Sequence, residues 1–339
     1  MEEVGAMTLT FGREAEAPTP MSAVSSPSPG VHTARASRGG EPRRHGDAGF
    51  DYVRVHSYDQ AVAALTEYGE GAKVIAGGQS LVPMVNLRLV RPTVLIDVNG
   101  IDPERPYVEY DHLVIPAMTR HSQLLASPVV QSHCPLLAQA VAHVGNVRVR
   151  NRGTLGGSLA QGEATAEIGA VALALDGEIT AYGPQGHRIM RSEDFFLGFL
   201  TTALGPEELV TGLRLPLAGP KRGWSFHEMT RRVGGMAIVG VAATVELAPD
   251  AEVVRSVRVS LIGVAERPVI GEPGATSSLL GEVPSAAHLD AVAAAVAAAT
   301  RPRDDVLASG SYRSRLARVL TRRALTEALL GAGGRIAAA

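Results

Sequence analysis

The sequence predicts an α+β fold, and three observations support this class. Helix-like and strand-like segments alternate from about residue 50 onward, and segment 183–186 (GPQG) is typical of a turn between two strands. Two long β-like runs follow at 237–247 and 254–264. Two helix-like segments end the pattern at 287–299 and 311–330. This mixed, partly antiparallel order favours α+β over a doubly wound parallel sheet.

The preceding elements are short periodic or apolar runs that end at turn residues. Strands are predicted at 51–55, 73–76, 94–98, 113–116 and 178–182. Helices are predicted at 58–68, 81–89, 122–126 and 134–144. Pro, Gly and Lys cluster at 216–223, where we place a domain boundary. The predicted domains are therefore 49–219 and 220–332, after an extension of 1–48 that we expect to be disordered because it is rich in Pro, Ser, Gly and charge and lacks a signal peptide's apolar segment.

Composition excludes several classes of function. The 339 residues suffice for two domains, and a net charge of −2 gives no general attraction to nucleic acid or anionic membranes. The single cysteine, Cys134, excludes a disulfide framework, a cysteine zinc site and an iron–sulfur cluster held by this chain alone. The histidines lack metal-ligand spacing, and no apolar run reaches the ~18 residues of a membrane span. We therefore expect a cytoplasmic protein without a metal site.

A glycine-rich segment, AGGQSLVPMVNLRL (76–89), follows the predicted strand 73–76 and leads into a predicted helix. Gly77 and Gly78 allow a ligand to approach the backbone closely. Ser80 can cap the helix or donate to an anion, and Pro83 suits a first helical turn. A helix N-terminus here would favour a negative group. The alternative is a tight strand–helix turn that binds nothing.

A second segment, RVRNRGTLGGSLA (148–160), repeats this arrangement before another helical stretch. Two such loops suit a ligand with two adjacent phosphates, because each loop can take one side of a pyrophosphate. The alternating Arg148, Arg150 and Arg152 would share one face of a strand, where they add charge to the site or face solvent.

Three other interpretations of these loops are weaker. A Rossmann site lacks the third glycine of its motif, although Asp97 lies twenty residues after Gly77. A P-loop lacks its Gly-Lys-Ser/Thr. Gly156-x-Ser158-x-Ala160 only partly matches a nucleophile elbow, and no acid–histidine pair is identifiable.

The chain resembles the FAD-binding medium subunit of the molybdenum hydroxylases, the group that includes carbon monoxide dehydrogenase, xanthine dehydrogenase and aldehyde oxidase. The resemblance covers about residues 50–330. Its segments are the two glycine loops, LIDVNGI (95–101), IPAMTRHSQL (115–124), FHEMTRRVGGMAIVGVAATV (226–245) and SGSYRSRLARVLTRRAL (309–325).

The resemblance implies a two-lobed FAD-binding domain of the vanillyl-alcohol oxidase (PCMH) type and a smaller α+β C-terminal domain. One side of the FAD pyrophosphate would contact Ala76, Gly77, Gly78, Gln79 and Ser80, and the other side Thr154, Leu155, Gly156, Gly157 and Ser158. Glu167 stands where the family has an aspartate directed at the polar part of the cofactor, and Val210 where it packs an aliphatic residue near the flavin. Val210 is equally consistent with an ordinary core residue.

The sequence departs from the family at two places. Gly162-Glu163-Ala164 replaces the usual Ala-Asp-Pro after the second loop. Gly235 and Met236 replace an acidic residue and an aromatic that ordinarily lies against the isoalloxazine ring, so Met236 changes access and electronics there.

The resemblance implies a heterotrimer, commonly doubled, with an iron–sulfur small subunit and a molybdopterin large subunit, in which this chain passes electrons to NAD, quinone or oxygen. A stand-alone FAD-dependent enzyme and a non-catalytic scaffold are the alternatives. In the closing helix, Leu316, Val319 and Leu320 form a short apolar stripe, and five arginines form either a solvated face or a docking surface for an acidic partner: Arg313, Arg315, Arg318, Arg322 and Arg323.

Overall fold

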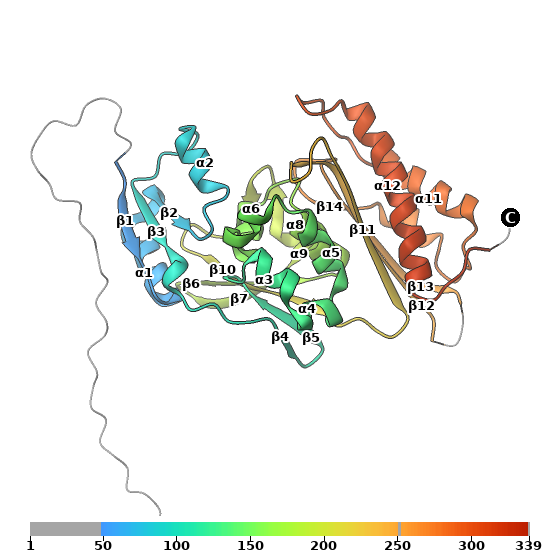
Figure 1. Cartoon of the computed structure of the whole chain (residues 1–339), viewed down its shortest axis with the longest axis horizontal. Helices are drawn as coiled ribbons and strands as arrows, with labels where there is room; N and C mark the ends of the chain where they lie inside the picture. The colour runs from blue at the N-terminus through green and yellow to red at the C-terminus, as the bar shows by residue number, and fades with distance from the viewer. Residues whose placement is uncertain (1–48, 250–251, 338–339) are drawn as a thin grey trace, which may run out of the picture. The chain divides into compact units, whose positions relative to one another are not determined.

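A computed structural model describes residues 49–249 and 252–337 of the chain. The extension predicted at 1–48 lies outside these residues. Within the described part, helices combine with one parallel and three antiparallel sheets, as the α+β prediction requires (Figure 1).

The first sheet is parallel and has three strands, in the order β1-β3-β2. Its strands are β1 (Asp51–Arg54), β2 (Ala72–Ile75) and β3 (Val94–Asp97). Helix α1 (Tyr58–Tyr68) begins where Ser57 accepts a hydrogen bond from the Gln60 N–H, and its buried face packs on the sheet. Because the strands are parallel, β2 and β3 end at the same edge. The first glycine loop and Asp97 therefore lie at one edge of this sheet.

The second sheet has five strands that pair antiparallel, in the order β4-β5-β10-β6-β7. Its strands are β4 (Tyr107–Glu109), β5 (His112–Pro116), β6 (Glu178–Gly183), β7 (Gly186–Arg191) and β10 (Leu209–Pro216). Alternate residues, such as Leu113 and Ile115, are fully buried, which is the period of two expected for a sheet with one covered face. The predicted 183–186 turn joins β6 to β7.

Six short helices lie between β5 and β6 in the described part of the chain, and two of them correspond to the predicted helices at 122–126 and 134–144. They are α3 (His121–Ala126), α4 (Pro128–His133), α5 (Pro135–His143), α6 (Val147–Arg152), α7 (Leu155–Gln161) and α8 (Glu167–Ala174). The helix predicted at 134–144 begins one residue later, because Cys134 is non-helical and Pro135 occupies the first turn. The arginine segment is a helix rather than a strand, since Asn146 caps it by accepting from the Arg148 and Val149 N–H groups.

The C-terminal part contains a four-stranded antiparallel sheet and three helices. The strands are β11 (Arg222–Thr230), β12 (Ala237–Leu247), β13 (Val254–Ile262) and β14 (Val269–Ile270). Earlier in the chain, the short helix α9 (Ser192–Phe195) is followed by a small hairpin of β8 (Phe196–Gly198) and β9 (Thr201–Thr202). The helices are α10 (Pro273–Ser277), α11 (Ala286–Ala298) and α12 (Gly310–Gly331). Buried residues of α11 and α12 share a core with β12 and β13.

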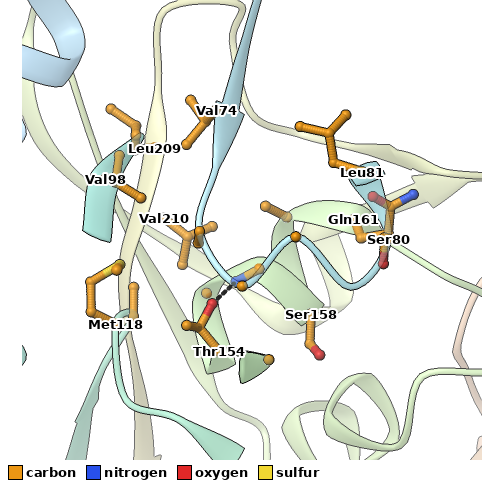
Figure 2. Close-up of a pocket in the computed structure, with 18 of the residues that line it drawn as sticks. Val74, Ser80, Leu81, Val98, Met118, Thr154, Ser158, Gln161, Leu209 and Val210 are labelled. Carbon is orange, nitrogen blue, oxygen red and sulfur yellow. Dashed lines mark hydrogen bonds between the residues drawn. The ribbon is translucent and has the colours of Figure 1, made fainter. Parts of the chain in front are cut away.

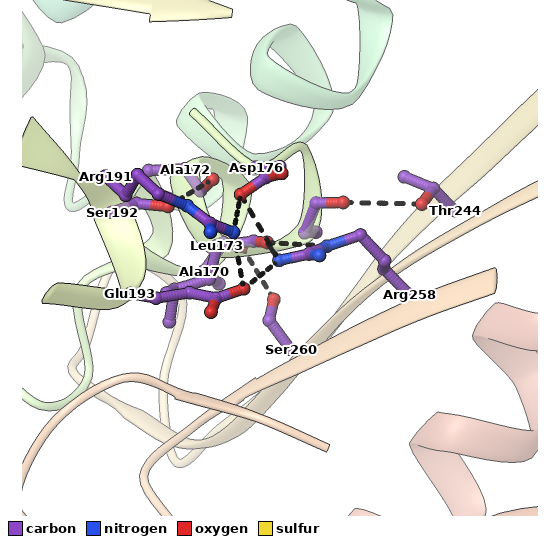
Figure 3. Close-up of polar contacts among 11 residues, drawn as sticks. Ala170, Ala172, Leu173, Asp176, Arg191, Ser192, Glu193, Thr244, Arg258 and Ser260 are labelled. Atoms are coloured by element: carbon purple, nitrogen blue, oxygen red, sulfur yellow. Dashed lines mark hydrogen bonds and ion pairs between the residues drawn. The ribbon is translucent and has the colours of Figure 1, made fainter. Parts of the chain in front are cut away.

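Strands β12 and β13 are tied to helix α8 by hydrogen bonds to its carbonyl groups (Figure 3). Ser260 donates to the Ala170 oxygen at 2.6 Å, and Thr244 donates to the Ala174 oxygen at 3.3 Å. Arg258 donates to the Leu173 oxygen at 3.1 Å and pairs with Glu193 at 2.5 Å. Thr244 and Arg258 thereby contact carbonyl groups in the last turn of α8, which lack i+4 donors within the helix, whereas the Ala170 oxygen lies one turn earlier.

The arginines of α12 do not form one solvated face. Arg313 is only 4% exposed, donates to the Ile238 and Gly263 carbonyl oxygens, and pairs with Asp305 at 2.6 Å. It is therefore a core residue, so the surface predictions were wrong for it. Arg318 forms an ion pair with Asp290 of α11 at 2.6 Å. This arginine of the expected docking surface is therefore already paired with a carboxylate of the same chain. The apolar stripe is also incomplete, because Leu316 and Leu320 are buried whereas Val319 is half exposed.

Candidate functional site

The first glycine loop leaves backbone donors free. Gly78 adopts a positive φ of 72°, which turns the chain sharply between β2 and α2 (Leu81–Asn86). Within the described residues, no protein group accepts a hydrogen bond from the N–H groups of Gly77, Gly78, Gln79 or Ser80. Four adjacent free donors form a concave surface suited to an anion.

Helix α2 is shorter than predicted, and it contributes less to an anion site than the sequence suggested. It ends at Asn86 rather than at residue 89, since Arg88 takes a positive φ of 59°, and the side chains of Leu87 and Leu89 are 71% exposed. No apolar partner therefore holds the last predicted turn. The Ser80 side chain makes no capping hydrogen bond. Its hydroxyl remains available, and the free N–H groups rather than a helix dipole are the groups of this loop that suit a negative charge.

The second glycine loop uses most of its donors internally. The Leu155 and Gly156 N–H groups donate to the carbonyl oxygens of Thr119 and Ala117, at 3.0 and 2.8 Å. Thr154 caps α7 by accepting from the Gly157 N–H at 3.1 Å (Figure 2). Among the described residues, only the Thr154 N–H of this loop lacks an acceptor. The second loop is therefore held rigidly by its own hydrogen bonds. It allows a ligand to approach its backbone closely and presents the Ser158 hydroxyl, but it has few free N–H groups.

The two loops touch each other. A Cβ on Gly77 would lie 2.2 Å from the Arg152 carbonyl oxygen and 2.8 Å from the Gly153 Cα. A Cβ on Gly156 would lie 2.5 Å from the Ala117 Cβ. Neither position can hold a larger residue without movement of the backbone. Glycine is therefore required at Gly77 and Gly156 for packing as well as for ligand access.

A cavity of about 280 Å³ lies between the loops. Its apolar wall consists of Val74, Val98, Met118, Leu209 and Val210 (Figure 2). Ten of the thirteen site residues predicted from the sequence line it: Ala76, Gly77, Gly78, Gln79, Ser80, Thr154, Gly156, Gly157, Ser158 and Val210. Adjacent free donors with an apolar wall fit a ligand that carries both phosphate and ring systems.

Three predicted residues do not line this cavity. Leu155 is fully buried in the core under the second sheet. Glu167 begins α8, and Met236 lies in the loop before β12 with 58% of its surface exposed. The structure therefore brings the two loops and Val210 together but leaves Glu167 and Met236 outside the cavity lining.

Glu167 lies near a second carboxyl group, that of Glu228, which the sequence did not single out. Burial, together with the neighbouring charge of Glu167, raises the pKa of Glu228 to about 8. Burial raises the pKa of Glu167 to about 7. Both carboxyl oxygens of Glu228 are inaccessible and lack a hydrogen-bond partner among the described residues. The pair therefore holds a proton near neutral pH, since two buried carboxylates would repel each other.

His121 is a cavity residue that the sequence prediction missed. Its side chain is 3% exposed, and Nε2 lies 3.1 Å from the Thr154 carbonyl oxygen and 3.3 Å from Ser158 Oγ. Burial lowers the pKa of His121 to about 4, so the ring is neutral at pH 7. The ring therefore supports the second loop. Its place one residue before a predicted helix gave no indication of this contact.

Within the parts that the structure describes, no group of three or more His, Cys, Asp or Glu side chains is arranged to hold a metal ion. No helix among those residues is both long and apolar enough to cross a membrane.

Two protein families match the chain in succession. The family described as the FAD binding domain in molybdopterin dehydrogenase matches residues 48–218. The family described as the CO dehydrogenase flavoprotein C-terminal domain matches residues 224–328. The first match contains both glycine loops, and the second contains Glu228 and Met236.

Individual relatives match over most of their length. The carbon monoxide dehydrogenase medium chain of Hydrogenophaga pseudoflava is 35% identical over 280 residues, covering 82% of this chain and 96% of that protein. The 6-hydroxypseudooxynicotine dehydrogenase complex subunit alpha of Paenarthrobacter nicotinovorans is 34% identical, covering 83% and 94%. A solved structure of carbon monoxide dehydrogenase from Hydrogenophaga pseudoflava superposes with a TM-score of 0.80 at 34% identity, covering 83% of this chain and 97% of that chain.

Proposed function

The chain belongs to the FAD-binding medium subunits of the molybdenum hydroxylases, and from this we propose where it holds its cofactor and how it works with partners. It is a subunit of a FAD-dependent oxidoreductase. Bound FAD supplies the ability to accept and release electrons. The observation that carries our proposal is the row of four free N–H groups at Gly77–Ser80 beside the second loop.

We propose that these N–H groups bind the FAD pyrophosphate. Gly157 is the exposed glycine of the second loop, and the absence of a Cβ there leaves the backbone open to the phosphates. The Ser80 and Ser158 hydroxyls add donors. Leu155 would not contact the cofactor; its side chain packs in the core and supports the second loop. Val210 forms part of the apolar wall against which a ring system packs.

Glu167 and Met236 have a different proposed role, because neither lines the cavity between the loops. Gly235 and Met236 belong to the segment that joins β11 to β12, and Met236 is largely exposed. We propose that this segment covers the isoalloxazine end of the cofactor, where a flexible thioether replaces the aromatic ring that relatives carry. Glu167 would approach the same cofactor from the start of α8.

We further propose a complex with an iron–sulfur small subunit and a molybdopterin large subunit, assembled as a heterotrimer or as two such heterotrimers. The relatives include a chain of a dehydrogenase complex, which supports this assembly. In the proposed complex, the partner subunits oxidise the substrate, and electrons leave through this chain to NAD, quinone or oxygen. The partners must provide the clusters, because one cysteine cannot hold them.

Purification from the native host, with flavin, iron and molybdenum analysis, tests the proposal. We expect one FAD for each chain and two co-purifying polypeptides that carry iron and molybdenum. Acid precipitation should release all of the flavin, because Cys134 is buried and burial raises its thiol pKa to about 12. Flavin that stays on the precipitated chain contradicts non-covalent binding. A lone chain that oxidises a substrate by itself supports the stand-alone enzyme instead.

A further inference from the structure

A chain of hydrogen bonds connects the two glycine loops through Asn99 and Arg120, two residues that do not line the cavity. It begins at the first loop, where the Asn99 amide nitrogen donates to the Ala76 carbonyl oxygen at 2.8 Å. The Arg120 guanidinium donates through Nη2 to the Asn99 amide oxygen at 2.6 Å. It also donates through Nη1 to the carbonyl oxygen of Arg152, the residue before Gly153. Two side chains thus span from one loop to the other.

The orientation of the Asn99 amide is fixed by its neighbours. Its nitrogen contacts two acceptors, the Ala76 carbonyl oxygen and the Asp97 carboxylate, while its oxygen contacts the Arg120 guanidinium. The Asn99 backbone N–H also donates to Asp97 Oδ1 at 2.9 Å. A flipped amide would place its oxygen against two acceptors and its nitrogen against the Arg120 donor, so only this orientation satisfies all partners.

Arg120 serves this connection rather than an ion pair. No carboxylate oxygen lies within ion-pair distance of Arg120 among the residues that the structure describes. Burial and the neighbouring charge of Arg152 lower the pKa of Arg120. Partial burial of a guanidinium that has no carboxylate partner costs free energy unless hydrogen bonds to other acceptors offset it. One of its two acceptors, the Arg152 carbonyl oxygen, is the atom against which Gly77 packs, and the other belongs to Asn99, which holds the Ala76 carbonyl oxygen.

We propose that Arg120 and Asn99 are positioning residues, which set the spacing of the two glycine loops and thereby the affinity for the diphosphate half of FAD. The inference rests on the proposed place of the pyrophosphate. The planar guanidinium holds two acceptors at fixed separation, which a lysine with the same charge cannot do. The distance between the loops matters because the second loop is rigid. It cannot adjust to a phosphate that the donors of the first loop hold in the wrong place.

Calorimetric titration of flavin-free protein with FAD, ADP and riboflavin tests this role. For Arg120→Gln and Asn99→Ala, we expect the Kd for FAD and ADP to rise on the order of 10- to 100-fold, as the loss of a charge-assisted hydrogen bond implies. The Kd for riboflavin, which has no phosphate, should stay unchanged. The double variant should bind ADP about as well as either single variant, because both changes break one connection. Arg120→Lys should not restore binding.

Arg313→Lys is the matched control, because Arg313 is also an arginine that holds two carbonyl groups but lies in the C-terminal part. It should lower the melting temperature without changing the Kd for ADP. Restoration of ADP binding by Arg120→Lys, or wild-type ADP binding in both single variants, overturns the positioning role. If those variants bind normally while Gly157→Ala impairs ADP binding, the loops still hold the pyrophosphate. If wild-type protein binds FAD but no variant of either loop affects it, both proposals fail.

Discussion

Gly77 packs directly on the backbone of Arg152, so that a Cβ at Gly77 would lie 2.2 Å from the Arg152 carbonyl oxygen. Two segments separated by more than seventy residues in the sequence therefore meet with no room for one methyl group. This contact sets the distance between the two loops that line the cavity, and the free N–H groups supply its hydrogen-bond donors. The consequences of disturbing it, and of changing the groups around it, can be measured.

The first prediction is that Gly77→Ala separates the loops. The added methyl group forces backbone movement, so we expect a loss of about 1–3 kcal/mol in the free energy of unfolding and a loss of most bound FAD. The ratio of flavin to protein absorbance and urea denaturation measure the two effects. Gly198→Ala is the control, since a Cβ there has no neighbour within 4 Å. Full flavin occupancy in Gly77→Ala would show that the contact is not needed.

The second prediction separates binding from folding at Gly157. A Cβ there would lie 2.9 Å from Thr154 Oγ1, the atom that caps α7, so Gly157→Ala should still fold but lose about 1 kcal/mol in the free energy of unfolding. It should nevertheless weaken FAD binding on the order of 10-fold or more, because the methyl group stands where the phosphates approach the backbone. Titration of the flavin-free protein measures this. Equal Kd values for the variant and the wild type would contradict the proposed pyrophosphate site.

The third prediction concerns the pKa of Glu228, which is raised from 4.5 to about 8 in the folded protein. The folded state binds this proton more tightly than the unfolded state, so the contribution to stability is full below about pH 4.5 and is lost as the pH rises through 8. Glu228→Gln cannot ionise. Its melting temperature should therefore fall less than that of the wild type between pH 6 and pH 9.

Glu266→Gln is the control for this measurement, because Glu266 is a half-exposed partner of Arg303. Its melting temperature should follow the wild-type curve. Parallel curves for Glu228→Gln and the wild type, at equal flavin occupancy, would show that Glu228 does not hold a proton.

The fourth prediction uses the opposite shift at His121, whose pKa falls from 6.5 to about 4 on burial. Between those values the unfolded state binds more protons, so the free energy of unfolding falls as the pH falls from 6.5 to 4. His121→Gln keeps a donor for the Thr154 carbonyl group but cannot titrate. The stability difference between wild type and variant should shrink as the solution is acidified, which denaturation at several pH values measures. A constant difference would exclude this linkage.

Much of the local structure was accessible from the sequence, because local rules govern it. The apolar run at 113–116 and the alternating apolar residues of 178–182 predicted strands, and the GPQG segment predicted the turn that follows the second of these strands. The strongest failure was the arginine segment 148–152, where alternation suggested a strand. The Asn146 cap formed a helix instead, which shows that a local hydrogen bond outweighed the apparent period.

The sequence by itself determined the two glycine loops, the α+β class and the family, since these depend on residue types at fixed spacing within short segments. It also placed ten residues that line one cavity. Only the tertiary structure decided that Gly77 meets Arg152, that Arg120 reaches Arg152 and Asn99, and that Arg313 is buried. It also placed Glu167 near enough to Glu228 for its charge to raise the pKa of Glu228. These contacts join segments distant in the chain, and their energies depend on burial and on the dielectric around each group, which no local pattern encodes.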